Sequence, residues 1–365
     1  MVRLRVPLLL LAASTAIAAV NGADENQRRL RMVWELNVAP LTANPERGAP
    51  DVLALRFSPD GEWIAAITSR ITTEGDRTEL LLVPSTGDAS KVRRFQIRGD
   101  ALSTPLHTGV HWSTSSTHIA VETKNFSTTI LRVADGARCE LPRTTVFGGF
   151  VAEDEAIAAD WDAPSDPAAI PEDFSTLTTY SADCVRLKTW RVRGRVREIE
   201  TSARTGMLAL RPEQGDIRIL DATGAERGRV AIGAGSMLRF GEKGRVLCKA
   251  DYPAHGSLAC YDLERAQQFS HPYVIGGAPF DVSLDSSIVV ATHGTSSIDP
   301  LSERGTAGLS HWVVWNYRTG EEIGRVRYRK QRHGYAFSPS AVAPNGRHFM
   351  LAAGGVLRMY EITGS

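Results

Sequence analysis

A pattern of short strands and tight turns recurs seven times along the 365-residue chain. In each copy an apolar strand, a tight polar turn and a second apolar strand are followed by a third strand of alternating polarity. Gly, Asp and Asn in several turns supply the positive φ angles that a tight hairpin needs. The turns are SPDGEW (58–63), STSSTH (113–118), AEDEA (152–156), SARTGM (202–207), GEKGRV (241–246), LDSSI (284–288) and APNGRH (343–348).

The spacing of these copies predicts an all-β, seven-bladed β-propeller with four antiparallel strands in each blade. From Ile64 to Phe349 the copies follow one another at about 47 residues, close to the roughly 40–45 residues of a propeller blade. Six copies contain a fourth strand, whereas the last copy ends at Ser365 after three. An apolar strand at 32–38 is left over near the other end of the chain. Because ring closure removes unpaired sheet edges, we expect this N-terminal strand to complete the last blade.

The first 23 residues have the pattern of a secretory signal peptide. Arg3 and Arg5 precede an uncharged stretch at 6–20, and small residues suited to cleavage follow. The apolar stretch has about 15 residues, fewer than the roughly 20 that span a bilayer. We therefore expect a signal peptide at 1–23, one propeller domain at 24–365, no transmembrane span in the mature chain and a periplasmic or secreted location. A retained N-terminal anchor is the alternative.

The four cysteines permit two disulfides in an exported protein. Cys248 and Cys260 flank a predicted hairpin whose midpoint is residue 254. They can therefore face each other across adjacent antiparallel strands, where Cα atoms lie within disulfide range. Cys139 and Cys184 both start predicted fourth strands, in blades 2 and 3, and could bridge those blades. Four buried free thiols are the alternative.

Two segments, RFSPDGEWIAAI (56–67) and VVWNYRTGEEIGRV (313–326), resemble WD-repeat units. The Trp-Asp dipeptide of that family ends the third strand, and its Gly-His pair before the first strand is missing here. The resemblance covers residues 32–365, and exported TolB-type and quinoprotein-like propellers are the most similar in style. It implies the propeller fold and leaves the function open. The pairs at the Trp-Asp position are Leu220-Asp221, Tyr261-Asp262, Trp315-Asn316 and Tyr360-Glu361.

The charge of the chain argues against a nucleic-acid partner. Its 42 Lys and Arg residues nearly cancel its 41 Asp and Glu residues, so the overall basic charge typical of nucleic-acid binding is missing. A basic run at 186–197 nevertheless contains arginines at alternate positions, which would lie on one side of a strand at the outer rim. Docking of a partner and protection of an exposed strand edge are the two interpretations. The arginines are Arg191, Arg193, Arg195 and Arg197.

An acidic, Pro-rich segment at 161–174 predicts a long loop between the second and third strands of blade 3. Asp160, Asp162 and Asp166 could offer oxygens to Ca²⁺. Their spacing lacks the glycine and the final glutamate of an EF-hand, so a solvated acidic loop is the preferred interpretation. No metal or other cofactor is predicted.

Long loops at one face of the propeller form the predicted binding surface. Connections between second and third strands share that face with the connections between blades, and long loops on a rigid scaffold often bind ligands. A scatter of aromatic residues and histidines without common purpose is the alternative. The candidates on or near this face are His107, Trp161, Tyr252, His255, His293, His333 and Tyr335.

Taken with the fold, these features favour a non-catalytic binding or scaffold protein that contacts a protein or cell-envelope component through the loop face. The alternative is a propeller enzyme, lactonase-like or quinoprotein-like, with a polar or metal site at the channel mouth. The chain has neither a G-x-S-x-G elbow nor an H-E-x-x-H motif, and no catalytic residue is predicted. Three or more carboxylate or Asn side chains converging in the channel would favour the enzyme, and a channel plugged by apolar residues would favour binding.

Overall fold

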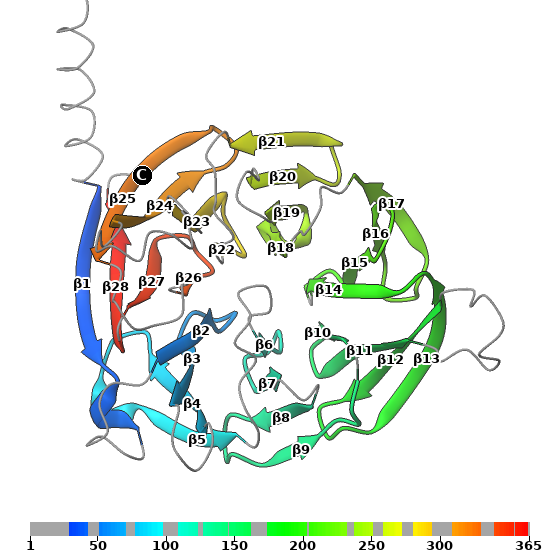
Figure 1. The fold of residues 1–365 in the computed structure, drawn as a ribbon, viewed down its shortest axis with the longest axis horizontal. Coiled ribbons are helices and arrows are strands. Elements are labelled where there is room, and N and C mark those ends of the chain that lie inside the picture. Colours follow the sequence, from blue (N-terminus) through cyan, green and yellow to red (C-terminus); the bar gives the residue numbers. More distant parts are fainter. Residues whose placement is uncertain are drawn as a thin grey trace, which may run out of the picture.

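Seven four-stranded antiparallel sheets form a ring in the computed structural model of the chain (Figure 1). This arrangement confirms the predicted all-β, seven-bladed propeller. In the residues that the structure describes, no helix has the length and apolar character needed to cross a bilayer. The described residues are 29–42, 51–70, 77–97, 109–122, 127–144, 146–161, 174–202, 204–231, 237–250, 258–271, 280–293, 309–329, 339–353 and 355–363.

The strands of each blade follow one another from the centre of the ring to its rim (Figure 1). Blade 1 comprises β2 (Asp51–Phe57), β3 (Trp63–Arg70), β4 (Arg77–Pro84) and β5 (Arg93–Ile97). Blade 2 comprises β6 (Val110–Trp112), β7 (His118–Glu122), β8 (Thr128–Arg132) and β9 (Arg138–Glu140). Blade 3 comprises β10 (Val146–Ala152), β11 (Glu155–Trp161), β12 (Phe174–Ser181) and β13 (Arg186–Arg193).

The remaining blades repeat this order, and the last of them takes its outer strand from the other end of the chain. Blade 4 comprises β14 (Val196–Ser202), β15 (Met207–Pro212), β16 (Ile217–Leu220) and β17 (Glu226–Val230). Blade 5 comprises β18 (Met237–Gly241), β19 (Val246–Ala250), β20 (Leu258–Asp262) and β21 (Gln267–His271). Blade 6 comprises β22 (Phe280–Val282), β23 (Ile288–His293), β24 (Leu309–Asn316) and β25 (Glu321–Arg329). Blade 7 comprises β26 (Ser340–Val342), β27 (His348–Ala353), β28 (Val356–Ile362) and β1 (Leu30–Asn37), and short 3₁₀ turns lie at Ala39–Leu41, Ala89–Lys91 and Glu242–Gly244.

The hydrophobic core is divided among the interfaces between neighbouring blades. Successive side chains of a strand point to opposite faces of its sheet, and the second strand of blade 1 shows the consequence. Ile64 and Ala66 pack against blade 7, in a cluster with Met350. Ala65 and Ile67 pack against blade 2, in a cluster with Val110. Each blade therefore buries apolar surface on both faces, and each depends on both of its neighbours.

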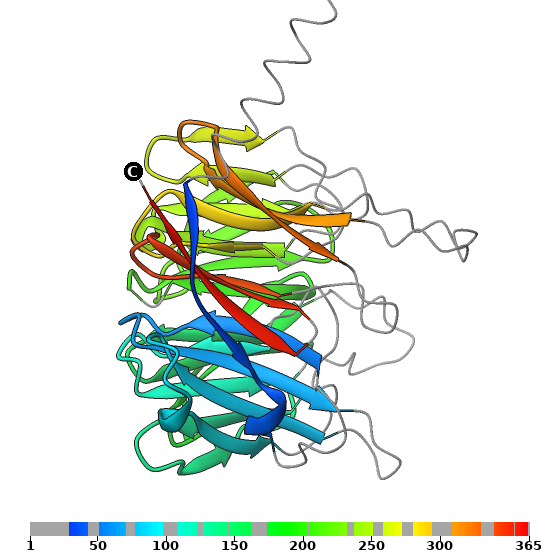
Figure 2. The ribbon, with the colours of Figure 1, turned by 90° about the vertical axis from the view of Figure 1, so that its left-hand side faces the viewer.

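The N-terminal strand closes the ring as predicted. β1 pairs antiparallel with β28, from Leu30 opposite Ile362 to Asn37 opposite Val356. In the side view β1 (blue) runs along β28 (red) (Figure 2). The register shifts between Met32 and Trp34, so that the Trp34 ring packs against the cluster shared by blades 7 and 1.

Both predicted disulfides are present. Cys248 and Cys260 lie directly opposite each other in β19 and β20, and Cys139 is bonded to Cys184, which joins blade 2 to blade 3. One detail of the prediction was wrong, because Cys184 does not start the fourth strand of its blade. It lies in the turn before β13, where its φ is 62°.

The two disulfides are expected to stabilise the fold to different extents. Chain-entropy arguments give about 3 kcal/mol for a separation of 12 residues and about 4 kcal/mol for one of 45. We therefore expect paired Cys→Ala replacement at 139 and 184 to lower the free energy of unfolding more than replacement at 248 and 260. Urea unfolding of both variants measures the difference. Non-reducing peptide mapping that finds free thiols at these positions would contradict the pairing.

Candidate functional site at the central channel

Charged side chains from the inner strands meet in the middle of the ring. They come from four blades and are largely buried: the side chains of Glu200 and Arg239 are 4% and 5% exposed, and that of Arg56 is 19% exposed. Glu198 and Glu200 are two positions apart on one strand and so point to the same side of it. The group consists of Arg56 (β2), Glu198 and Glu200 (β14), Arg239 (β18) and Asp281 (β22).

Glu200 is shared by two guanidinium groups. Its Oε2 atom lies 3.4 Å from Arg239 Nη1, and its Oε1 atom lies 3.5 Å from Arg56 Nη2. Buried charges are costly unless they are paired and hydrogen-bonded. Removing this one carboxylate would therefore take an anionic partner from two buried cations at once.

The three carboxylates of this group also bind the inner strand of the next blade. Glu198 accepts hydrogen bonds from the Leu238 backbone N–H and from Arg211 Nε, both at 2.9 Å. Glu200 accepts from the Phe240 N–H at 3.4 Å, and Asp281 accepts from the Val342 N–H at 2.8 Å. An inner strand is the edge of its sheet, so its outward N–H groups need partners outside the ladder. These side chains supply such partners between blades 4 and 5 and between blades 6 and 7.

Burial and charge act against each other on the pKa values in the channel. Burial raises the pKa of Asp281, and Arg56 and Arg239 offset this only in part. Burial likewise lowers the pKa of Arg239, with Glu200 opposing the shift. For Arg56 burial also acts to lower the pKa, but Glu200 and Asp281 together outweigh it and the pKa is raised.

The channel matches the expectation for an enzyme in its number of carboxylates, but these carboxylates are already paired. Three carboxylates converge, which is the feature expected of an enzyme, but all three are engaged by guanidinium groups or backbone N–H groups. The channel is also not closed by apolar residues alone. Within the described ranges, no cluster of three or more His, Cys, Asp or Glu side chains could hold a metal ion.

A cavity of about 80 Å³ lies where the channel opens on the face of the first-to-second-strand turns. All seven blades contribute to its wall, since its lining includes the ends of the inner strands and the turns that follow them. The apolar part of the wall includes Trp112, Phe150 and Phe240. The charged and histidine side chains of the lining are Arg56, His111, Glu200, Arg204, Lys243 and Asp281.

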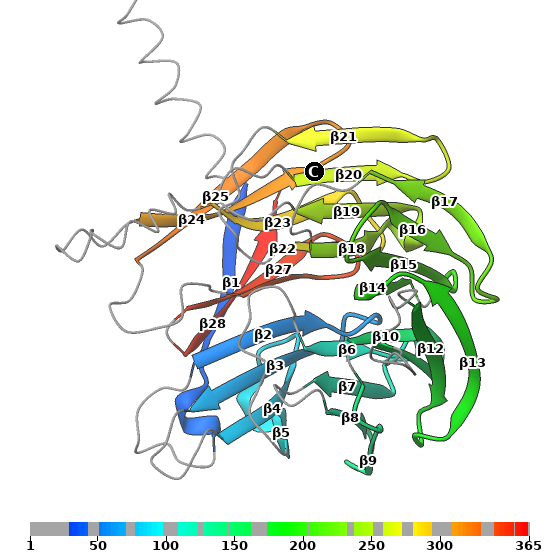
Figure 3. The ribbon, with the colours of Figure 1, turned by 45° about the vertical axis from the view of Figure 1, so that its right-hand side comes forward.

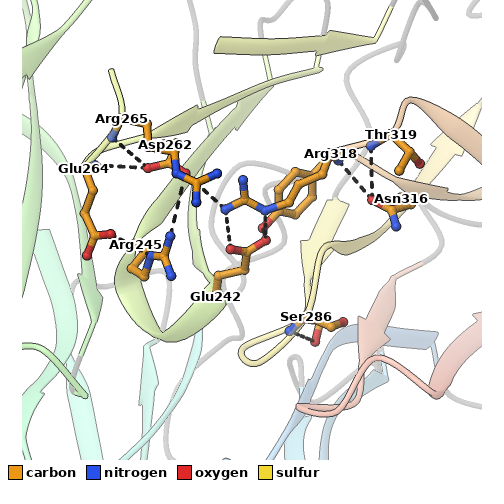
Figure 4. Close-up of polar contacts among 11 residues, drawn as sticks. Glu242, Arg245, Asp262, Glu264, Arg265, Ser286, Asn316, Arg318 and Thr319 are labelled. Carbon is orange, nitrogen blue, oxygen red and sulfur yellow. Dashed lines mark hydrogen bonds and ion pairs between the residues drawn. The ribbon is translucent and has the colours of Figure 1, made fainter. Parts of the chain in front are cut away.

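A second polar network joins blades 5 and 6 on the same face (Figure 4). Arg318 donates hydrogen bonds to both oxygens of Glu242, and its Nη2 also donates to Asp262 at 3.1 Å. The Tyr317 hydroxyl donates to Glu242 at 2.8 Å. Burial acts to raise the pKa of Glu242, but the bonds from Arg318 and Tyr317 outweigh it and hold the pKa below its usual range. This network links two blades through groups that are already paired with one another.

Residues at the Trp-Asp position of the WD-like units shape the turns that follow the third strands. Asp221 accepts hydrogen bonds from the N–H groups of Thr223 and Ala225. Asp262 accepts from the N–H groups of Glu264 and Arg265, and Asn316 accepts from that of Arg318 at 3.0 Å. The side-chain oxygens thus satisfy backbone donors that the ladder leaves free.

Most of the predicted loop-face residues lie outside the described residues. His107, Tyr252, His255, His333 and Tyr335 belong to this group, as do Asp162 and Asp166 of the possible Ca²⁺ site, so these predictions stay untested. Trp161 is the last residue of β11, His293 is the last residue of β23, and Asp160 lies within β11. In the backbone register His293 is opposite His311.

The predicted row of four rim arginines is divided between two blades, which corrects that prediction. Arg191 and Arg193 lie on β13, the outermost strand of blade 3 (Figure 3). The strand ends there because Gly194, with a φ of 92°, turns the chain toward the next blade. Arg197 lies on the inner strand β14 and is paired with Glu213, and Arg195 lies 4.0 Å from the same carboxylate. Of the four predicted arginines, only Arg191 and Arg193 therefore lie on the rim strand.

No residue of the channel group was predicted from the sequence. In MLRFG (237–241) and FDV (280–282) the only trace in the sequence is one charged residue in a short strand that is otherwise apolar, whereas VREIETS (196–202) contains three charged residues. Each of these strands also contains residues that pack between blades, such as Ile199 and Phe240. A charged residue at an inward-facing position of a buried inner strand is the sequence pattern that would have predicted the channel group.

Comparison with known proteins supports the fold and goes no further. No family model matches the chain, and no curated protein matches it. Among solved structures 1136 chains match. One belongs to the crystal structure of the Mitotic Checkpoint Complex and aligns with a TM-score of 0.58 and 12% identity, over 92% of this chain and 96% of that one. With seven blades of four strands, the fold is that of a WD-repeat-like propeller.

Proposed function

We propose that this protein is an exported, non-catalytic binding protein that holds a protein or cell-envelope component on the face of its long connections. The observation that carries the proposal is the asymmetry of the connections. Strands alternate in direction within each blade, so the second-to-third-strand connections and those between blades leave from one face. Strand ends at that face are separated by long stretches of sequence, 12 residues between β11 and β12 and 15 residues between β23 and β24. On the opposite face the first-to-second-strand turns are as short as 58–62 and 153–154.

The ring suits such a role because it holds its loops on a rigid base. Interfaces between blades are apolar on both sides of each sheet, and the channel carboxylates connect inner strands. Binding segments are most effective on a scaffold that does not change shape. A chain of similar fold belongs to the Mitotic Checkpoint Complex, and this supports a protein as the kind of partner.

Export is supported by the cysteines. All four are engaged in disulfides, and disulfides persist in oxidising compartments such as the periplasm and the extracellular space. Together with the signal-peptide pattern at 1–23, this favours a periplasmic or secreted protein whose mature chain begins near residue 24.

Quantitative capture from envelope extracts tests the proposal. The tagged mature chain is compared with two variants in which 163–172 or 295–307 is replaced by a short Gly-Ser linker. The partner recovered by wild type is expected to fall about tenfold or more with at least one of them, because a few residues carry most of a binding energy. Mass spectrometry measures recovery, and circular dichroism checks that the ring is intact.

A rim variant serves as the matched control. Replacing Arg191 and Arg193 by Ser alters the outer strand of blade 3 and leaves the long connections unchanged. Arg191 lies over the Phe174 ring at 4.5 Å, so a stability loss of at most about 1 kcal/mol is expected. Capture by this variant should equal that of wild type. Loss of capture here, with full capture by both loop variants, would move the binding surface to the rim and overturn the proposal.

A further inference from the structure

Two exposed apolar side chains lie close together on the rim of blade 3. Val185, which is 60% exposed, immediately precedes β13, and Leu187, which is 54% exposed, lies within it (Figure 3). The described part of the chain exposes only two other large apolar side chains, Met32 and Val33 on β1. Single exposed apolar residues are ordinary on a protein surface. A neighbouring pair marks a surface that can contact another apolar medium.

The turn before β13 is held in place from both sides. The Ser181 N–H donates to the Val185 carbonyl oxygen at 2.8 Å, and the Val185 N–H donates to Ser181 Oγ at 3.2 Å. The adjacent Cys184 is bonded to Cys139 of blade 2. The exposure of Val185 therefore belongs to a fixed turn that is tied to two blades.

The register of the strand shifts at Leu187. Lys188 is opposite Thr179 and Arg186 is opposite Tyr180, so that Leu187 is an extra residue, as in a β-bulge. A bulge interrupts the alternation of side chains between the two faces of a strand. All five residues from 185 to 189 are exposed, and the two apolar side chains alternate with cations.

The charges on this strand are positive. Arg186 and Lys188 have no carboxylate within ion-pair distance among the described residues, and Lys188 Nζ lies 3.5 Å from the Thr223 carbonyl oxygen. Asp183, in the preceding turn, lies 3.9 Å from Arg132 of blade 2. β13 as a whole contains four cations and no acid, so the strand keeps a net positive charge even when Asp183 is counted with it.

The other exposed apolar pair, on β1, lies in a surface of balanced charge. Arg31, which precedes Met32 and Val33, is ion-paired with Glu361. Arg347 lies 3.7 Å from the same carboxylate. Exposed apolar side chains and cations without an ion-pair partner therefore occur together on β13, whereas on β1 the neighbouring cation is paired.

We propose that the start of β13 is a contact surface for an anionic membrane. Val185 and Leu187 enter the boundary between headgroups and acyl chains, and Arg186 and Lys188 contact the anionic headgroups. Such binding is favourable because the burial of apolar side chains and the attraction of cations to a negative surface act together. β13 lies on the outer side of the ring, where a bilayer can reach it (Figure 1).

A lipid surface fits this arrangement better than an acidic protein does. A protein partner would need a pocket shaped for the two aliphatic side chains, whereas a bilayer accepts them without shape complementarity. Long Lys and Arg side chains also reach headgroups while their neighbours are buried in the apolar layer. The surface is separate from the long connections of the function proposed above, because the start of β13 lies at the face of the short turns.

Flotation of the mature chain with protein-free vesicles tests the surface. Vesicles of phosphatidylcholine and phosphatidylglycerol in equal parts should bind it about tenfold or more tightly than vesicles of phosphatidylcholine alone, and added salt should weaken the binding. Replacing Arg186 and Lys188 together by Ser should lower the affinity about tenfold or more, since each cation near an anionic surface contributes about fivefold. Leu187→Ser should lower it about fivefold, through the loss of apolar burial.

Matched variants on blade 7 separate this surface from general effects of charge and apolar exposure. Arg31→Ser with Arg347→Ser removes two positive charges, as the β13 double variant does. Met32→Ser removes an apolar side chain that is 51% exposed. Both controls should keep an affinity within about twofold of wild type, because charges far from the bound surface are screened by salt. Circular dichroism checks that every variant is folded.

Several outcomes would overturn the proposal. They are equal binding to both kinds of vesicle, unchanged binding by either β13 variant, and an equal loss of binding by the blade 7 controls. Binding to soluble polyglutamate without binding to vesicles would assign the cations to an acidic protein and would overturn it as well. Because the vesicles contain no protein, a negative result here leaves the proposed partner capture standing, and a failure of partner capture leaves the membrane surface standing.

Discussion

Deletion of residues 24–40 is expected to lower the free energy of unfolding by about 5 kcal/mol or more. The deletion removes β1, which pairs with β28 along its whole length, and leaves blade 7 with an open edge. It also removes Trp34 and Leu36, which pack against the cluster between blades 7 and 1, and the fully buried Val38. Loss of one large core side chain lowers the free energy of unfolding by about 3–5 kcal/mol. Loss of a whole strand should lower it by more than the loss of any single side chain.

Trp34 is the point variant that isolates this closure. Its Nε1 donates to the Ser85 carbonyl oxygen at 3.0 Å, and its ring covers Gly87, where a Cβ would lie 2.6 Å away. It thereby joins blade 7 to blade 1. Trp34→Ala should cost about 3 kcal/mol. Met32→Ala, at a side chain that is 51% exposed on the same strand, should change stability by about 0.5 kcal/mol or less.

Urea unfolding and calorimetry of these variants measure the effect. A truncated chain that unfolds at the same urea concentration as the mature protein would show that the ring does not depend on its N-terminal strand. Equal losses for Trp34→Ala and Met32→Ala would show that strand pairing, and not packing at the closure, provides the stability.

Glu200→Gln is expected to cost about 3–5 kcal/mol, although the replacement is nearly isosteric. The carboxylate is buried and is ion-paired with both Arg56 and Arg239. Removing its charge leaves two guanidinium groups in a medium of low dielectric constant without adequate compensation. Replacing Glu200 and Arg239 together by Leu and Met should restore part of the loss, since an apolar pair leaves fewer uncompensated charges.

A surface pair provides the control for this experiment. Arg197 and Glu213 form an ion pair whose side chains are 39% and 37% exposed, and exposed pairs contribute about 1 kcal/mol or less. Glu213→Gln should therefore stay within that range, as measured by urea unfolding at pH 7. If Glu200→Gln is as mild as Glu213→Gln, water reaches the channel group and the buried network does not hold the inner strands together.

Features that depend on residues close together in the chain could be predicted before the structure was known. The alternation of apolar and polar residues along each strand, with the short polar turns, predicted seven units of antiparallel strands. The last unit lacked a fourth strand, and the segment 32–38 was correctly predicted to provide it. The Cys248–Cys260 bond followed in the same way, because a hairpin places residues equidistant from its turn opposite each other. The prediction that four alternating arginines lie on one strand was wrong, because the alternation continues on both sides of the turn at Gly194. The proposed roles of the loop-face residues stay predictions.

The contents of the centre of the ring depend on contacts between residues that are far apart in the chain. Arg56 and Glu200 are 144 positions apart and belong to blades 1 and 4, and Asp281 and Val342 are 61 positions apart. No spacing rule connects such residues, because their distance depends on how many blades close the ring and on which residue of each inner strand faces the axis. Local periodicity sets the direction of each side chain relative to its sheet, and ring closure alone sets which side chains from different sheets meet.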